Sequence, residues 1–414
     1  MQTKPASFLL ALFCALSGST SAAQDSWQEG EWTAETTLQL RHFPHDPLPQ
    51  NNLQHNNSAS LAMQLEYYAA WDNYDKSLTF TPFVRLDQHD EERSHADLRE
   101  FSYQQVFSSW ELRLGISKVF WGVTESQHLV DVINQTDQVE NIDGEDKFGQ
   151  PMIKASMERD WGILDLFILP GFRERSFQGI EGRPRPLLVV DTDHAAYESP
   201  DKQRHIDYAL RWFNYLGDIE IGLSYFNGTS REPLLIPGSN NSSPVLIPYY
   251  PLMQQAGLDA QLTTAEWLWK LELIARDWQA LDNSAQLVDQ RFVALAGGFE
   301  YTFVGVAQSD ADLGLVAEYL YDDRDEEATS FFQNDVLFGL RLAMNDAQSS
   351  EALLGLIHDL DNQEFMLSLE ASRRFAHHWT ASLEVRSFNR VDNNSPLAAI
   401  ARDDFVQLDI TRYF

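Results

Sequence analysis

Apolar and polar residues alternate with a period of two along most of this chain. Every second residue is apolar over 61–71, and the same rhythm returns over 267–275. A period of two is typical of β-strands, because successive side chains of a strand point to opposite faces. In the second segment Lys270, Glu272 and Arg276 share the face opposite the two tryptophans. The pattern therefore predicts an all-β protein whose strands each have one apolar and one polar face.

The connections between the predicted strands alternate between short and long. Short turns fall at 72–75 and 217–218, whereas longer polar segments cover 121–150, 171–203 and 277–289. This order is typical of bacterial transmembrane β-barrels, which have tight turns at one end and long loops at the other. It predicts an antiparallel transmembrane β-barrel of about 18 strands, with about 16 as the alternative. We expect both termini at the end with the short turns, and the first strand to pair with the last.

Hydropathy favours such a barrel over a bundle of membrane-spanning helices. The mean hydropathy is −0.35, and after the first residues no segment approaches the ~18 apolar residues that a spanning helix needs. A soluble sandwich or solenoid would also show alternation. Against that alternative, aromatic residues lie near the ends of predicted strands, as they do in the interfacial girdles of membrane barrels. These residues are Trp71, Trp110, Trp121, Trp161, Trp212, Trp379 and Tyr413.

The first residues have the features of a secretory signal. Lys4 supplies a positive charge, and the apolar run at 8–16 that follows is too short to span a membrane. Small residues up to Ala23 favour cleavage after that position. We therefore expect a signal peptide at 1–23 and a single barrel over 24–414.

Charge and cysteine usage narrow the partners and the chemistry. The full chain has a formal net charge of −32 at pH 7, and removal of Lys4 with the signal peptide would lower it by one. So acidic a chain argues against nucleic acid as a partner. Cys14 is the only cysteine and lies within the predicted signal peptide. The mature barrel is therefore expected to have no disulfide bond.

The last predicted strand ends on an aromatic residue, with apolar residues at alternate positions before it: Val406, Leu408, Ile410 and Phe414. This arrangement resembles the signal that the outer-membrane barrel assembly machinery recognises, although Arg412 stands where that signal usually has an aromatic residue. The resemblance implies the outer membrane of a Gram-negative bacterium as the location. Outer-membrane lipid and lipopolysaccharide would then surround the barrel.

A second segment combines three short motifs. A strand containing 112–115 is followed by Trp121 and Gly122, and then by a loop containing 131–134. This order resembles a group of porin-like outer-membrane barrels of unknown function. Members are often associated with inner-membrane exporters of the RND type and with periplasmic lipid-carrier-like proteins. The resemblance implies a periplasmic carrier or an RND-type transporter as a partner.

Charged residues within the predicted strands are expected to face the lumen, because Arg or Lys on the lipid face near mid-bilayer costs about 2–4 kcal/mol. The residues to which this applies are Asp207, Arg211, Glu266, Lys270, Glu272 and Arg276, together with Arg85, Arg341, Glu384 and Arg386.

The long connection at 171–203 is rich in arginine, although the chain is acidic. Folded into the lumen, its arginines would oppose acidic residues and narrow the pore. The alternative is salt bridging between loops at the rim. The acidic connection at 122–150 is also long, so we expect the two to attract each other across the lumen. The candidate residues for this constriction are Arg173, Arg175, Arg183 and Arg185, with Arg231 from the next loop.

These features favour a channel for small hydrophilic or amphiphilic solutes, narrowed by inward-folded loops. The alternative is a conduit for lipid or hydrophobic compounds that works with an inner-membrane exporter. A barrel enzyme would need a nucleophile, a base and an orienting group in one place, and the scattered histidines belong to no such motif. We therefore expect no catalytic residue, cofactor or metal site. Acidic loop runs such as 143–146 are interpreted as solvated charge, with weak divalent binding as the alternative.

Overall fold

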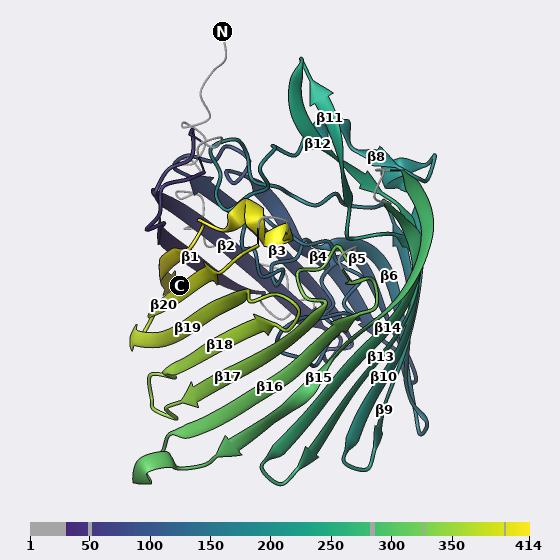
Figure 1. The fold of residues 1–414 in the computed structure, drawn as a ribbon. Helices are drawn as coiled ribbons and strands as arrows, with labels where there is room; N and C mark the ends of the chain where they lie inside the picture. Colours follow the sequence, from purple (N-terminus) through teal and green to yellow (C-terminus); the bar gives the residue numbers. More distant parts are fainter. Residues whose placement is uncertain (1–29, 49–51, 282–285, 326–327, 393–394) are drawn as a thin grey trace, which may run out of the picture.

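The computed structural model describes residues 30–48, 52–281, 286–325, 328–392 and 395–414. The predicted signal peptide lies outside these residues. Within them, 18 strands form one antiparallel sheet in which each strand pairs with the next along the chain (Figure 1). Strand β1 also pairs with β21 and closes the barrel. The predicted fold class, strand number and pairing of the first and last strands are confirmed.

The strands of the barrel are β1 (Glu31–His42), β2 (Asn57–Trp71), β3 (Lys76–Asp87), β4 (Ala96–Val106), β5 (Glu111–Ser117), β6 (Gln150–Arg159), β7 (Gly162–Pro170), β9 (Ile206–Leu216), β10 (Ile219–Thr229), β13 (Leu252–Thr264), β14 (Trp267–Leu281), β15 (Leu287–Phe303), β16 (Asp312–Asp322), β17 (Asn334–Ala343), β18 (Glu351–Asp359), β19 (Phe365–Ala376), β20 (Trp379–Asn389) and β21 (Phe405–Tyr413). A second sheet contains β8 (Ala196–Tyr197), β11 (Leu234–Asn240) and β12 (Ser243–Tyr250). Short 3-10 helices are η3 (Thr192–His194), η4 (Lys202–Arg204), η5 (Val306–Gln308) and η7 (Pro396–Ile400).

The two faces of each strand have opposite surroundings, as the alternation predicts. On β14, Trp269 and Leu271 are exposed on the outer surface, whereas Glu272 between Leu271 and Leu273 is fully buried inside. The same division recurs around the barrel and leaves a continuous belt of exposed Leu, Ile, Val and aromatic side chains. So large an apolar surface marks a contact with lipid or protein. No helix among the described residues has the length and apolar character to cross a bilayer.

Two segments that were predicted as loops contain β-strands. The segment 277–289 was expected to be an irregular connection, but β14 and β15 extend into it, and Asp277 pairs with Arg291. The extension is stable because Trp278 and Ala280 continue the inward apolar face. The loop after β10 likewise folds into the β11–β12 hairpin, which stands above the barrel rim (Figure 1). Strand β8 joins this hairpin in parallel.

Two long connections determine the shape of the interior. The lumen loop (residues 118–149) joins β5 to β6, and the arginine loop (residues 171–205) joins β7 to β9. Val130 and Ile133 of the lumen loop are fully buried in one apolar cluster with wall residues such as Phe226 and Ile274. Such a loop lies inside the barrel and packs against one side of its wall.

Candidate pore between the lumen loop and the barrel wall

Two wall carboxylates hold one end of the lumen loop. Glu272 on β14 accepts hydrogen bonds from the backbone N–H of Val123 at 2.7 Å, of Thr124 at 3.1 Å and of Val130 at 3.2 Å. Glu318 on β16 accepts the N–H of Glu125 at 2.8 Å. Carboxylates that accept several N–H bonds are stabilised in a buried setting, because each bond is charge-assisted. The loop therefore adopts one defined position against the wall.

The other end of the lumen loop reaches the opposite wall. Glu140 accepts a hydrogen bond from Arg85 on β3 at 2.6 Å. Further along, an Asp143 oxygen lies 3.4 Å from a guanidinium nitrogen of Arg386 on β20. The loop thus crosses the lumen from β14 and β16 to β3 and β20.

Two cavities lie between the lumen loop and strands β17–β20: an outer cavity of about 680 Å³ and an inner cavity of about 380 Å³. Together they are called the path. The outer cavity is lined by the halves of these strands nearer the long loops, such as Leu337 on β17, and the inner cavity by the other halves, such as Ala343. The two cavities are therefore stacked along the barrel axis. Four residues line both: Glu125, Asp143, Leu353 and Glu370.

The junction of the two cavities is acidic. Glu125 and Asp143 come from the lumen loop, and Glu370 comes from β19. Arg386 lies 2.6 Å from Glu370, and Arg341 lies 2.5 Å from Glu125. Over both cavities the lining contains seven carboxylates, three arginines and one histidine. The lining of the two cavities therefore carries more carboxylates than basic side chains.

Two residues of the lumen loop have shifted pKa values: Asp143 at the junction and His128 in the outer cavity. Burial raises the pKa of Asp143 to about 7; Glu384 and Asp146 add to this effect, and Arg386 opposes it. Burial disfavours the charge on His128, but the carboxylates of Glu145 and Glu272 outweigh it and raise the pKa of His128 to about 10. His128 therefore keeps its proton more readily than a free imidazole, and Asp143 takes up a proton more readily than a free carboxyl group.

The outer cavity also has an apolar side. Barrel lumens are normally polar, but here inward-facing aliphatic and aromatic residues of the wall form a strip, and two loop phenylalanines extend it. The strip contains Val316, Leu337, Leu353, Ile357, Met366 and Phe388, with Phe331 and Phe332. A solute in this cavity would contact apolar groups on one side and carboxylates on the other.

The arginine loop lies at the outer mouth. Arg173 pairs with Asp97 at 2.6 Å, and Arg183 pairs with Asp403 at 2.5 Å. Arg175 donates to the backbone oxygen of Arg231 at 2.8 Å. Arg185 donates to backbone oxygens, including that of Pro186 at 2.7 Å, and lines the outer cavity. The arginine and lumen loops do meet, for example where Ser176 donates to Asp137 at 2.6 Å.

The strand residues predicted to face the lumen mostly do so, but on the side filled by loops. Arg211 forms a bidentate pair with Asp259 at 2.7 and 2.8 Å. Asp207 pairs with Arg231 at 2.6 Å. Two further inward pairs are Lys270 with Glu125 at 3.7 Å and Arg276 with Glu232 at 2.8 Å.

Glu266 requires a correction. The prediction placed it on the lumen wall, but it lies in the turn before β14 and is exposed. Tight turns need residues that water can solvate, so a carboxylate there bears no cost. The alternation that begins at Trp267 does not extend back through the turn.

Sequence reasoning identified part of the path. Arg341, Glu384 and Arg386 were predicted to point inward and do line it. Glu370 was missed, although the alternation of β19 would have placed it on the inner face. Glu125 carries no such signal, because its position depends on how the lumen loop folds back onto β16. The outward positions of Val406 and Leu408 on β21 agree with a lipid-facing last strand.

Comparisons with known proteins show no family for this chain. No protein-family model matches this chain, and no curated protein matches its sequence. Among solved structures, it is similar to a loop-deletion mutant of OmpT, an outer membrane protein of Vibrio cholerae, with 10% identity and a TM-score of 0.46. That match covers 94% of this chain and 100% of the other. A porin refined at 1.8 Å resolution is similar at 10% identity and a TM-score of 0.42, covering 93% of this chain and 100% of that porin.

Proposed function

We propose that this protein is an outer-membrane channel whose solutes pass between the lumen loop and strands β17–β20. The observation that carries the proposal is the pair of stacked cavities that share Glu125, Asp143 and Glu370. The belt of exposed apolar side chains supports a position in a bilayer. Outer-membrane lipid, lipopolysaccharide and the barrel assembly machinery are the partners that this location would bring.

The preferred solutes are small cations with an apolar part. Carboxylates outnumber arginines along the path, so a cation gains Coulomb energy where an anion loses it. The apolar strip of the outer cavity would bind an alkyl or aromatic group of the same solute. We propose a passive channel and not an enzyme.

Planar-bilayer recording of the purified full chain tests this proposal. Stepwise conductance is expected. Under a tenfold KCl gradient, the sign of the reversal potential should show that potassium permeates more readily than chloride. A reversal potential of the opposite sign would reject the acidic junction as the selective element. No conductance at all would reject the channel.

The second candidate is a conduit for hydrophobic compounds that works with a periplasmic carrier or an RND-type exporter. The apolar strip supports this second candidate, because inward side chains such as Leu337 and Phe388 do not stabilise a hydrated ion. This candidate predicts that a fluorescent apolar amine binds the purified barrel even where ion conductance is absent. Binding that is lost on replacing Phe388 with Asn, without conductance in either form, would favour the conduit over the channel.

A further inference from the structure

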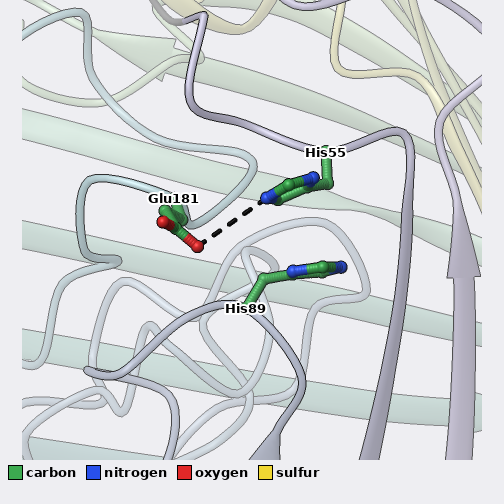
Figure 2. Close-up of side chains that lie close together, drawn as sticks. All are labelled: His55, His89 and Glu181. Carbon is green, nitrogen blue, oxygen red and sulfur yellow. Dashed lines mark ion pairs between the residues drawn. The ribbon is translucent and has the colours of Figure 1, made fainter.

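Two histidines and one glutamate from three different loops meet at the outer rim of the barrel. His55 precedes β2, His89 follows β3, and Glu181 belongs to the arginine loop (Figure 2). The imidazole rings of His55 and His89 are stacked, with centroids 3.7 Å apart and an interplanar angle of 18°. Nε2 of His55 lies 3.7 Å from Oε2 of Glu181. Each residue offers one donor atom, and these three atoms lie within 4.8 Å of one another.

Buried hydrogen bonds next to each of these residues hold the three loops together. Gln54 donates to the backbone oxygen of Gly182 at 2.6 Å, so the neighbours of His55 and Glu181 are joined directly. The carboxylate of Asp90, next to His89, accepts the N–H of Gly179 at 3.1 Å. Gln54 and Asp90 are only 7% and 4% exposed. The three side chains are therefore brought together by a backbone arrangement that does not depend on their own contacts.

We propose that His55, His89 and Glu181 bind one zinc ion. Two imidazole nitrogens and one carboxylate oxygen form a donor set that zinc takes up in proteins, with water in the fourth position. Bonds of about 2.1 Å in a tetrahedron place donor atoms about 3.4 Å apart. The donor atoms must therefore approach by at most ~1.4 Å. The two stacked rings must also turn out of parallel, because an imidazole nitrogen binds a metal in the plane of its own ring, and side-chain rotation supplies both movements. The side chains of His55 and Glu181 are 46% and 42% exposed, so they have room to rotate.

The charges around this cluster leave its carboxylate available for a cation. Of the three arginines that line the cavity beside the cluster, Arg183 lies 2.5 Å from Asp403 and Arg93 lies 2.8 Å from Asp87, whereas Arg41 donates to the amide oxygen of Gln407 at 2.7 Å. Glu181 instead faces His55 at 3.7 Å. A zinc ion bound between the two side chains would satisfy this carboxylate.

A second group, of one histidine and two carboxylates, is less suited to bind a metal ion. His95, Asp137 and Glu140 also bring their donor atoms within 4.8 Å. There, however, Arg99 lies 2.7 Å from Asp137, and Arg85 lies 2.6 Å from Glu140. Two guanidinium groups already neutralise the carboxylates and would repel a divalent cation. We therefore assign zinc to the rim cluster alone of these two.

Bound zinc would connect three loops at the mouth of the barrel. This inference goes beyond the proposed channel and does not depend on conduction. Isothermal titration of the purified full chain with zinc chloride should show one site per chain. His55→Gln and His89→Gln should each weaken zinc binding about tenfold or more, since each removes a ligand. Calcium chloride should give no saturable binding, because calcium prefers an all-oxygen shell.

His377→Gln is the matched control, because His377 lies in the turn between β19 and β20 and should leave zinc affinity unchanged. Heat-modifiability on a gel checks that each variant has folded. If a variant fails to fold, cobalt titration of the unaltered protein decides instead, through absorption bands of tetrahedral cobalt that zinc abolishes. Unchanged zinc affinity in both histidine variants would overturn the proposal, as would the absence of saturable zinc and cobalt binding in the unaltered chain.

Discussion

The lumen loop meets the two sides of the barrel wall in different ways. Toward β6–β15 it buries Val130 and Ile133 in an apolar cluster with Ile274 of the wall. Toward β17–β20 its contacts are ion pairs, Glu125 with Arg341 and Asp143 with Arg386, and the two cavities lie beside them. Contacts with the first side fix the position of the loop. The two cavities lie between the loop and the second side. One segment can therefore fill half of a lumen and line the other half.

The largest effect is expected from changes that detach the loop from the filled side. Glu272→Ala removes the acceptor for the N–H groups of Val123, Thr124 and Val130. Buried donors without a partner cost roughly 1–3 kcal/mol each. We expect a lower urea midpoint and larger, noisier single-channel conductance. Glu158→Ala, at an exposed end of β6, is the control. Unaltered conductance and stability in Glu272→Ala would show that the loop is held by other contacts.

Neutralising the open side should change selectivity while leaving stability nearly unaltered. The double variant Glu125→Gln with Glu370→Gln removes two charges from the junction of the cavities. The potassium-to-chloride permeability ratio should fall roughly two- to fivefold. The comparison is the triple variant of Arg173, Arg175 and Arg183 to Ala, which should widen the pore and raise its cation preference if these arginines narrow it. A larger selectivity change in that triple variant would assign the constriction to the arginine loop.

The open side should also respond to pH. Because burial raises the pKa of Asp143 to about 7, acidification from pH 8 to pH 6 protonates it and removes one negative charge from the junction. The cation preference measured by reversal potential should therefore fall as the pH drops through 7. Asp143→Asn should flatten this dependence. In this variant a smaller change in cation preference should remain at lower pH, because burial raises the pKa of Asp146 to about 6. If cation preference depends on pH in the same way in the unaltered protein and in Asp143→Asn, Asp143 is not the group that titrates.

The smallest effect is expected from the apolar strip. Leu353→Ala shortens an inward side chain on β18, and Leu354→Ala is a matched control because Leu354 points outward on the same strand. Block by tetrabutylammonium should weaken about two- to fivefold in Leu353→Ala, as expected for lost apolar contact. Block by tetramethylammonium should hardly change. Equal effects of both variants would mean that the strip does not contact the solute.

The fold was predictable from the sequence because a barrel repeats a local rule. Alternation around Trp269 and Lys270 shows which side chains face lipid, and closure then follows because a bilayer tolerates no unpaired strand edge. The same rule failed at Glu266, where the turn interrupts the pattern. It also failed over 277–289, where charged residues obscured the inward face of Trp278.

The path itself could be predicted only in part. Arg386 and Glu384 lie on a strand, so their direction follows from the pleat. Glu125 meets Arg341, which is 216 positions later in the chain, through the fold of an irregular loop. No local pattern encodes such a contact. The sequence predicts no metal site at the rim for the same reason, because His55 and His89 become neighbours only once three loops have docked.

The hydrogen bonds from the lumen loop to Glu272 and Glu318 have a consequence for biogenesis. A contact cannot form before both of its partners are in place, and these partners lie 142 to 193 positions after the loop residues that they hold. The lumen loop can therefore take its final position only after both β14 and β16 have formed, so the cavities beside it take their final shape late in assembly.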